Sequence, residues 1–221
     1  SNYVNDDSDC DDTDTDINPG EQEIACDNTD SNCDGNDSEY GINDLSAGDL
    51  ILTEIMNNPQ AVNDSKGEWF EIYNAGSLTY DLDGLDLTSS RSGNQSDAVD
   101  TCLAIAPGEY KVFVFNSHSN NNGGVTGDFD YNSIGLSNGS DTLSLVAGST
   151  TIDEVSWDNG STFPDPNGES ISLHPANTDP TENDIGTTWC EATSTFGDGD
   201  KGTPGAVNDN CGESIDTNVQ A

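Results

Sequence analysis

The sequence has almost no basic side chains. Four Lys and Arg residues stand against 43 Asp and Glu, which gives a formal net charge of −39 at pH 7. Lys66, Arg91, Lys111 and Lys201 are scattered along the chain, whereas binding to phosphate backbones or anionic lipid needs clustered Lys and Arg. We therefore expect neither nucleic acid nor a membrane surface among the partners of this protein.

Long apolar segments are missing as well. No hydrophobic run approaches the ~20 residues that a transmembrane helix needs, and no helical apolar period continues for three turns. Hydrophobic residues make up only 31% of the chain, while Gly, Ser, Thr and Asn are abundant. We therefore expect no membrane insertion, and an all-β fold with short strands and many loops.

Catalytic signatures are few. The two histidines are His118 and His174, and the chain lacks a Gly-x-Ser-x-Gly elbow, a phosphate-binding Gly loop and zinc-ligand spacing. Glu54, Glu68 and Glu71 lie on two expected neighbouring strands, and a carboxylate pair in such a place is compatible with glycoside hydrolysis. Because no further polar groups converge with them in the sequence, we predict that the chain is not an enzyme.

Strand patterns begin after residue 44. Short apolar or alternating stretches are separated by turn residues at the spacing expected of a sandwich or barrel. The predicted strands cover residues 50–56, 68–74, 85–88, 102–105, 110–115, 142–146, 152–157, 170–174 and 189–190. Alternation buries one face of each strand and leaves Ser144 and Ser172 on the other, as in an antiparallel β-sandwich. We expect Trp69, Trp157 and Trp189 in its core.

The first 44 residues, which we call the acidic segment, have a different composition. Fifteen carboxylates and no Lys or Arg lie between residues 6 and 44. Oxygen-bearing side chains recur at alternate positions, with Gly at a sharp turn, which is the pattern that Ca²⁺ selects. Two unit charges ~4 Å apart interact by roughly 4 kcal/mol at an effective dielectric constant of ~20, so these loops would resist folding without a cation.

The spacing predicts two Ca²⁺ ions, one in each of two loops. The ligands predicted for the first loop are Asp7, Asp9 and Asp11, with Asp14, Asp16 or Glu23 completing the set. The ligands predicted for the second loop are Asp30, Asn32, Asp34 and the main-chain carbonyl of Asn36, with Asp37 or Glu39 completing the set. The second loop begins like an EF-hand but has Gly41 where that motif needs a bidentate Glu, so it is not one. The acid excess beyond residue 44 fits either calcium loops or adaptation to high salt.

Several short motifs resemble the lamin tail domain. They are LTEIMNNP at 52–59, GEWFEIYN at 67–74, DLDGL at 81–85, IAPG at 105–108, LSNGSDTL at 136–143, GESI at 168–171 and GTPGAVN at 202–208. The resemblance implies an immunoglobulin-like β-sandwich, of a kind found in nuclear lamins and in secreted bacterial and archaeal proteins. It also implies that Glu54, Glu68 and Glu71, which fall inside these motifs, serve the fold or an additional cation site.

The acidic segment resembles the metal-binding repeat of MopE-type secreted proteins, and more loosely thrombospondin type 3 repeats. The matching string runs from DCDD at 9–12 through INPG at 17–20 to the CDG at 33–35. One copy is present, and Asn28 and Asn32 stand where such repeats have Gly and Asp. Both can still offer oxygen, although Asn32 lowers the charge of its loop.

Six cysteines in this acidic chain indicate disulfides and an oxidising compartment. Three lie in the acidic segment and three downstream, at Cys102, Cys190 and Cys211. If all are paired, these odd numbers require at least one bridge between the two parts or between molecules. We favour Cys10–Cys33, because both flank predicted ligands at the ends of the repeat; Cys26 would then pair downstream and fasten the acidic segment to the sandwich.

The chain is thus predicted to comprise the acidic segment (1–44), a lamin-tail-like sandwich (45–210) and a C-terminal tail (211–221). We expect a secreted or cell-surface, calcium-stabilised, non-enzymatic structural or adhesive protein. Its expected partners are further copies of itself, in an extracellular fibre joined by strand addition, another extracellular protein, or a polysaccharide. The alternative is an accessory binding module of a larger secreted hydrolase.

Overall fold

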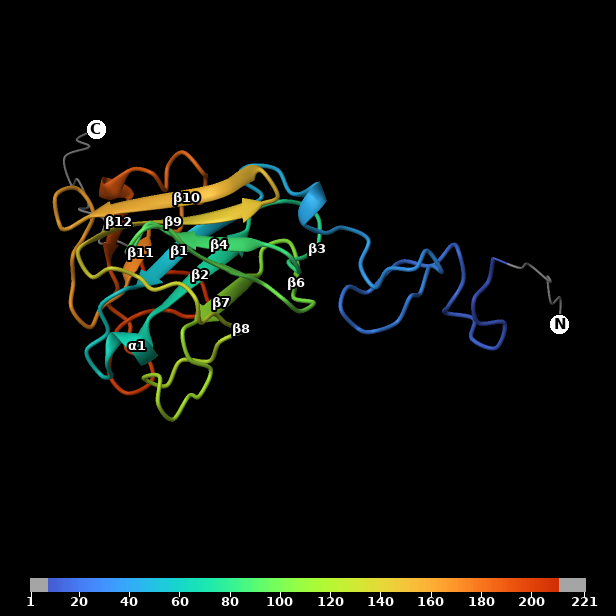
Figure 1. Cartoon of the computed structure of the whole chain (residues 1–221), viewed down its shortest axis with the longest axis horizontal. Helices are drawn as coiled ribbons and strands as arrows, with labels where there is room; N and C mark the ends of the chain where they lie inside the picture. The colour runs from blue at the N-terminus through green and yellow to red at the C-terminus, as the bar shows by residue number, and fades with distance from the viewer. Residues whose placement is uncertain (1–7, 211–221) are drawn as a thin grey trace, which may run out of the picture.

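The computed structural model describes residues 8–210. The predicted ligand Asp7, the cysteine Cys211 and the predicted tail (211–221) lie outside the described residues. Within residues 8–210 the chain forms a β-sandwich from which the acidic segment extends as an arm (Figure 1). None of the helices in this part of the chain has the length and apolar character needed to cross a membrane.

Two sheets face each other in the sandwich. The larger sheet has six strands in the order β12-β11-β1-β2-β7-β8, and the smaller has four in the order β10-β9-β4-β5. The larger sheet contains β1 (Leu50–Met56), β2 (Trp69–Asn74), β7 (Tyr110–Val114), β8 (Phe129–Asp130), β11 (Ile171–Leu173) and β12 (Trp189–Glu191). The smaller contains β4 (Asp86–Ser89), β5 (Gln95–Ala98), β9 (Ser140–Ala147) and β10 (Thr150–Asp158).

The remaining elements are short. A two-stranded ladder pairs β3 (Tyr80–Asp81) with β6 (Ala104–Ile105), and the helical turns are η1 (Ile42–Asp44), α1 (Asp64–Gly67) and η2 (Gly186–Thr188). All named strand pairs are antiparallel except β7 with β8. The all-β, immunoglobulin-like sandwich predicted from the sequence is confirmed.

The main core lies between the two sheets. Leu52, Phe70, Leu145 and Val155 are among its fully buried members, and the rings of Phe70 and Phe113 stack with their centroids 5.0 Å apart. Burial of such apolar surface is the main source of stability for a sandwich. Its strands form here because branched and aromatic residues alternate or run together between turn residues.

All three tryptophans are buried, as predicted. Trp157 and Trp189 belong to the main core, with 3% and 4% of their surface exposed. Trp69 belongs to a second cluster with Met56, Val112, Val114 and Val125. Phe196 packs against this second cluster and forms a T-shaped pair with Trp69, at a centroid distance of 5.7 Å.

The prediction that Ser144 and Ser172 face solvent is wrong. Ser144 is 6% exposed and Ser172 is fully buried. Ser172 lies in β11, and its hydroxyl donates to the Glu54 carboxylate of β1. The chain after β12 returns over this face of the larger sheet and donates to the same carboxylate from Thr203, so the strand is enclosed on both sides.

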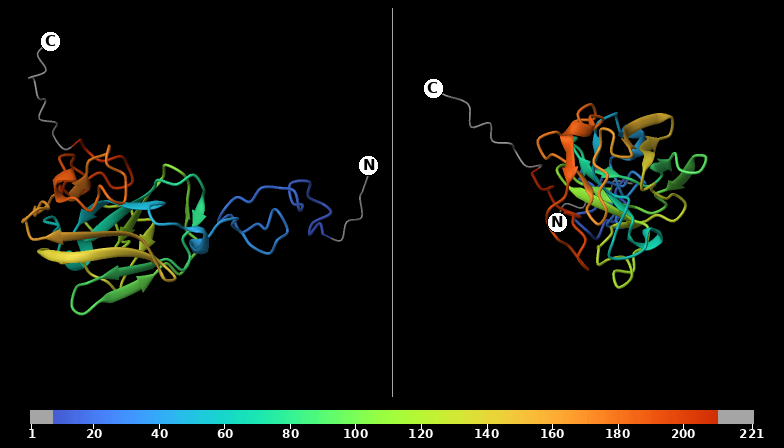
Figure 2. Two further views of the ribbon diagram at one scale, coloured as in Figure 1. Left: turned by 90° about the horizontal axis from the view of Figure 1, so that it is seen from above. Right: turned by 90° about the vertical axis from the view of Figure 1, so that its left-hand side faces the viewer.

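The favoured Cys10–Cys33 pairing and the expectation that Cys26 pairs downstream are confirmed. Cys10 is bonded to Cys33 within the acidic segment, and Cys26 is bonded to Cys102 just before β6. Cys190 is also disulfide-bonded. Residues 8–41 contain no helix or strand, and Figure 2 shows them leaving the sandwich at the end where β3 lies. The arm therefore holds its shape through turns and covalent bridges.

Candidate functional site

The second predicted calcium loop forms a compact turn around Asp30. The Asp30 carboxylate accepts the backbone N–H groups of Asp34 (3.0 Å) and Gly35 (2.9 Å). The Asn32 side-chain oxygen accepts the N–H of Asp34 (2.9 Å), and Asp34 accepts the N–H of Asn36 (2.8 Å). Asp34 Oδ1 also accepts from the Asn36 amide at 3.1 Å, whereas the Asp30 and Asn32 oxygens each keep a second lone pair, so the turn gathers two carboxylates and an amide oxygen that still have acceptor capacity.

Glu23 lies against this second loop. Its Oε1 accepts the N–H of Asn32 at 2.7 Å, while its Oε2 is buried and has no hydrogen-bond partner among the described residues. Only 9% of the Glu23 surface is exposed. A buried carboxylate oxygen without a partner carries a large desolvation cost, and a hard cation is a group that would satisfy it.

Asp37 and the first loop are arranged differently. The Asp37 carboxylate accepts the N–H groups of Asp27 (3.2 Å) and Asn28 (2.8 Å), so it holds the turn that follows Cys26. In the first loop successive side chains each accept the backbone N–H two residues later; these pairs are Asp9 with Asp11, Asp11 with Thr13, and Asp14 with Asp16. The side-chain hydrogen bond from Thr13 lowers the pKa of Asp11.

The oxygen donors of the acidic segment fit a hard cation, although they are not fully gathered. Within residues 8–210, the single group of three acidic or cysteine side chains with ligand atoms within 4.8 Å is Cys26, Asp81 and Cys102. Two of these are joined as a disulfide, so the group is no metal centre. The donor set of carboxylates and amides, together with the unpartnered Glu23 oxygen, suits Ca²⁺.

Two further carboxylates are enclosed in the larger sheet. Glu54 of β1 lies opposite Glu71 of β2, and both are fully buried. Glu54 accepts from the hydroxyls of Ser170 and Ser172, and from the N–H of Thr203 at 3.0 Å. Burial raises the pKa of Glu54; burial and the charge of Glu54 raise the pKa of Glu71 well above its usual range.

These two glutamates anchor residues 202–208, which we call the closing segment. Glu71 accepts the N–H of Gly205 at 2.7 Å, while Asn208 donates to the carbonyls of Thr53 (2.7 Å) and Leu173 (2.9 Å). Because the chain covers both carboxylates, they are closed to a substrate. Their partners give them the role in the fold that the motif resemblance implied.

Glu68, the third glutamate of that sequence cluster, instead lines a polar cavity of about 630 Å³. The cavity lies between α1, residue 91 after β4, the start of β5 and residues 132–135. Arg91 Nη1 lies 3.3 Å from Glu68 Oε1 and donates to the Leu136 carbonyl at 3.0 Å, while Glu68 Oε2 accepts the N–H of Leu136 at 2.9 Å. Burial raises the pKa of Glu68 to about 7.

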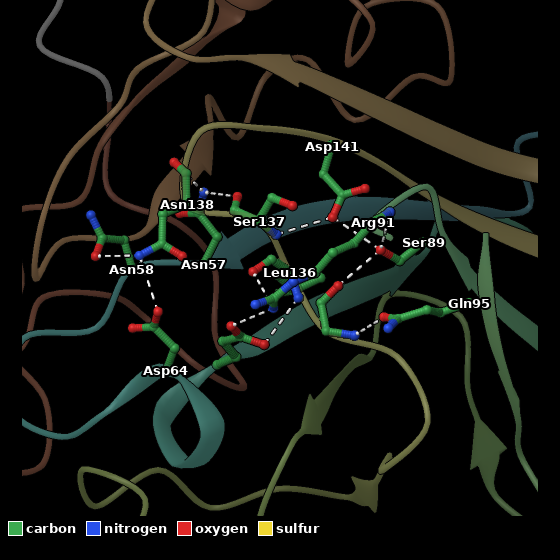
Figure 3. Close-up of polar contacts among 12 residues, drawn as sticks. Asn57, Asn58, Asp64, Ser89, Arg91, Gln95, Leu136, Ser137, Asn138 and Asp141 are labelled. Atoms are coloured by element: carbon green, nitrogen blue, oxygen red, sulfur yellow. Dashed lines mark hydrogen bonds and ion pairs between the residues drawn. The ribbon is translucent and has the colours of Figure 1, made fainter. Parts of the chain in front are cut away.

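Hydrogen bonds hold the walls of this cavity (Figure 3). Gln95 Oε1 accepts the N–H of Gly135 at 2.9 Å, and the Ser89 hydroxyl donates to the Gly135 carbonyl at 2.8 Å. Asn138 donates to Asp64 Oδ2 at 3.1 Å. A Cβ at Gly135 would meet Arg91 Nη1 at 2.6 Å, so glycine makes room for the guanidinium group.

Sequence reasoning missed this cavity. Its walls come from α1, Arg91, β5 and the loop at 132–135, which only the folded chain brings together. The hydroxyl of Tyr131 is buried nearby without a hydrogen-bond partner in the described part of the chain. Burial and the neighbouring Glu68 charge raise its pKa. The motif around Glu68 was visible in the sequence, but it carried no signal that its carboxylate would face a cavity.

The family model of the Lamin Tail Domain matches residues 43–159. No curated protein and no solved structure matches the chain. The matched range contains β1 to β10 and the residues that line the polar cavity, whereas β11, β12 and the closing segment follow it.

Proposed function

Because the chain belongs to the lamin tail domain family, a non-catalytic immunoglobulin-like family of structural and binding modules, we propose that it is a non-enzymatic structural or adhesive protein of the cell exterior. In this proposal the sandwich is the working module, and Ca²⁺ orders the acidic segment that projects from it. The observation that carries the proposal is a disulfide-bridged acidic arm with a buried, unpartnered carboxylate oxygen.

Calcium binding is supported by the chemistry of the arm. Asp30, Asn32, Asp34 and Glu23 already lie in contact with one another's backbone or side chains. A bound Ca²⁺ ion would supply the positive charge that this oxygen-rich turn lacks. The first loop, with Asp9, Asp11, Asp14 and Asp16, would hold the second ion, with Asp7 preceding it in the chain. The likeness to MopE-type repeats points the same way.

Location and self-association are further parts of this proposal. Disulfides form and persist in oxidising compartments, which supports secretion.

The outer strand β10 is nine residues long and pairs with β9 alone in its sheet. An edge strand offers backbone groups to an added strand, which supports assembly into a fibre. Negative-stain microscopy of the chain with Ca²⁺ and with chelator tests this; monodisperse single molecules in both would exclude a fibre.

The first test is calcium binding by the intact chain. We expect calorimetric titration to show saturable binding with Kd of ~10⁻⁴ to 10⁻³ M, the range of extracellular modules. Ca²⁺ should also slow cleavage of the arm by a glutamate-specific protease. Glu23→Gln and Asp30→Asn should each weaken binding, because each removes one ligand charge.

The matched control is Glu21→Gln, which makes the same charge change at an exposed position two residues from Glu23. It should bind Ca²⁺ like the unmodified chain. If millimolar Ca²⁺ produces neither heat nor protection, or if Glu21→Gln weakens binding as much as Glu23→Gln, the calcium assignment is wrong.

A second test concerns the attachment of the arm. Glu39 is exposed and precedes η1, so a glutamate-specific protease can cut the chain there. We expect the fragment that carries Cys26 to stay bound to the sandwich until reductant is added, because of Cys26–Cys102. The Cys26→Ser/Cys102→Ser double variant should release it without reductant, whereas Cys10→Ser/Cys33→Ser should not. Mass spectrometry under non-reducing conditions distinguishes these outcomes.

The second candidate function is an accessory binding module of a larger secreted hydrolase. The polar cavity favours this function, because it combines an ion pair between the partly exposed Arg91 and the buried Glu68 with uncommitted hydrogen-bonding groups. The Glu54–Glu71 pair, in contrast, is buried and closed to a ligand.

A further inference from the structure

We propose that the polar cavity beside Glu68 and Arg91 binds a sugar residue of a neutral polysaccharide. This inference deepens the second candidate function and rests on the sandwich alone, not on the calcium-binding arm. The cavity volume of about 630 Å³ falls in the range of ~300 to 1,000 Å³ that small-molecule sites occupy.

The cavity is a built site, because its central groups are fixed from inside the fold. Glu68 is 2% exposed and is held by both Arg91 and the Leu136 N–H. Gln95 accepts the N–H of Gly135 and Ser89 donates to its carbonyl, so both polar backbone groups of Gly135 are held in place. Figure 3 shows Arg91 lying between Leu136 and Ser89. Polar groups with fixed positions bind a ligand with little ordering cost.

Several groups on the wall keep unused hydrogen-bonding capacity. Among the contacts of the described residues, the Arg91 guanidinium donates to protein acceptors through Nη1 alone, although it has five N–H donors. Gln95 uses its amide oxygen and keeps its NH₂ group, and Asp64 uses Oδ2 and keeps Oδ1. The cavity wall thus carries free N–H donors on Arg91 and Gln95 and a free carboxylate acceptor on Asp64. Hydroxyl groups, which donate and accept, match such a mixture.

The wall also has an apolar part and a nearly balanced local charge. Phe115 is half-buried, lines the cavity and offers surface for the C–H groups of a sugar ring. The charges of Arg91, Glu68 and Asp64 sum to −1 if both carboxyls are ionised. Since Arg91 is already paired with Glu68 and the chain carries a net charge of −39, an anionic ligand is repelled. A neutral, hydroxyl-rich ligand fits best.

The test uses the full-length chain in native gels that contain one soluble polysaccharide each. The neutral probes are a β-glucan, a galactomannan and dextran, and the anionic probe is alginate. We expect at least one neutral polysaccharide to retard the chain, equally at low and high salt and equally with Ca²⁺ or chelator. Calorimetry with an oligosaccharide of that polymer then gives the affinity.

Variants locate the binding. Ser65→Trp and Ser133→Trp fill the mouth of the cavity from two sides, since both serines line it and are exposed; each should abolish retardation. Asp64→Ala removes the free acceptor and should weaken binding about tenfold, as expected for a charge-assisted hydrogen bond. Ser149→Trp, in the exposed turn between β9 and β10, is the control and should bind normally. Thermal melting verifies that each variant folds. If a Trp variant does not fold, the result with Asp64→Ala decides the test.

The proposal is overturned if no neutral polysaccharide retards the chain, if alginate alone does so, or if Asp64→Ala and the folded Trp variants bind like the unmodified protein. Because Glu23→Gln tests the arm and leaves the cavity intact, loss of calcium binding with retained sugar binding, or the reverse, separates the failure of one proposal from that of the other.

Discussion

Replacing Glu54 by Ala is expected to lower the free energy of unfolding of the sandwich by about 3–5 kcal/mol. The carboxylate is fully buried and accepts hydrogen bonds from Ser170, Ser172 and Thr203. Without it, these donors stay in the interior with no acceptor, and a cavity remains where the side chain was. The closing segment would lose its main attachment to β1.

For a chain of this length the midpoint of thermal unfolding should fall by roughly 6–20 °C, since each kcal/mol corresponds to about 2–4 °C. Calorimetry or circular dichroism measures this shift. The matched control is Glu169→Ala, which removes a carboxylate that pairs with the partly exposed Lys201 and should cost at most about 1 kcal/mol. A Glu54→Ala variant that melts within the error of the unmodified chain would contradict the anchoring role.

Stability is expected to fall as the pH rises from about 4 to about 7, the reverse of the usual trend for an ion-paired acidic group. Burial raises the pKa of Glu68 from 4.5, and that of Asp153 from 3.8, to about 7 in both cases. Asp153 is 4% exposed and accepts the N–H of Leu52 and the amide of Asn183. The raised pKa of Glu71 acts in the same direction.

The sign follows from proton binding. Between the unfolded and folded pKa values, the folded chain keeps protons that the unfolded chain has released. This contribution to stability is therefore complete below about pH 4, declines as the pH rises, and is fully lost once the folded-state groups ionise at about pH 7. At 1.36 kcal/mol per pKa unit, Glu68 and Asp153 each account for about 3–4 kcal/mol. Urea unfolding at pH 4.5 and 7.5 measures the total loss.

Isosteric variants separate burial from general charge repulsion. Glu68→Gln and Asp153→Asn should each flatten the pH profile, because a buried amide does not titrate. Asp165→Asn makes the same charge change at an exposed position and should leave the slope unchanged. A stability that increases between pH 4.5 and 7.5, or an equal flattening by all three variants, would contradict this assignment.

The parts of the fold that the sequence predicted correctly are those with strong local patterns. Apolar runs located β1, β2, β7 and β9 to within a few residues. The odd number of cysteines on each side of residue 44 predicted a bridge between the two parts or between molecules, and Cys26–Cys102 is such a bridge. Strand β5 (Gln95–Ala98) was missed because it lies at the edge of its sheet and its residues are polar. An edge strand needs less apolar surface, so alternation gives no signal there.

The rest depends on contacts between residues far apart in the sequence. Ser172 was predicted to face solvent because it points away from the main core, between Ile171 and Leu173. That side of the sheet is covered by the closing segment, however, and the Ser172 hydroxyl donates to Glu54 there. In the acidic segment, the residue spacing located the turn at residues 30–36. It did not reveal that Glu23 contacts Asn32, because these residues are nine positions apart and only the folded arm brings them together. The polar cavity gathers pieces from four segments, which no local pattern predicts.

The Cys26–Cys102 bridge has a mechanical consequence. It closes a covalent ring that contains η1, β1, β2 and all strands up to β5. When tension is applied to the arm ahead of residue 26, the force passes through the sulfur atoms to Cys102, and the backbone between the two cysteines stays slack. The first strands of the larger sheet therefore cannot be peeled away from that terminus while the bridge is intact, a property that the proposed adhesive or fibre role would need.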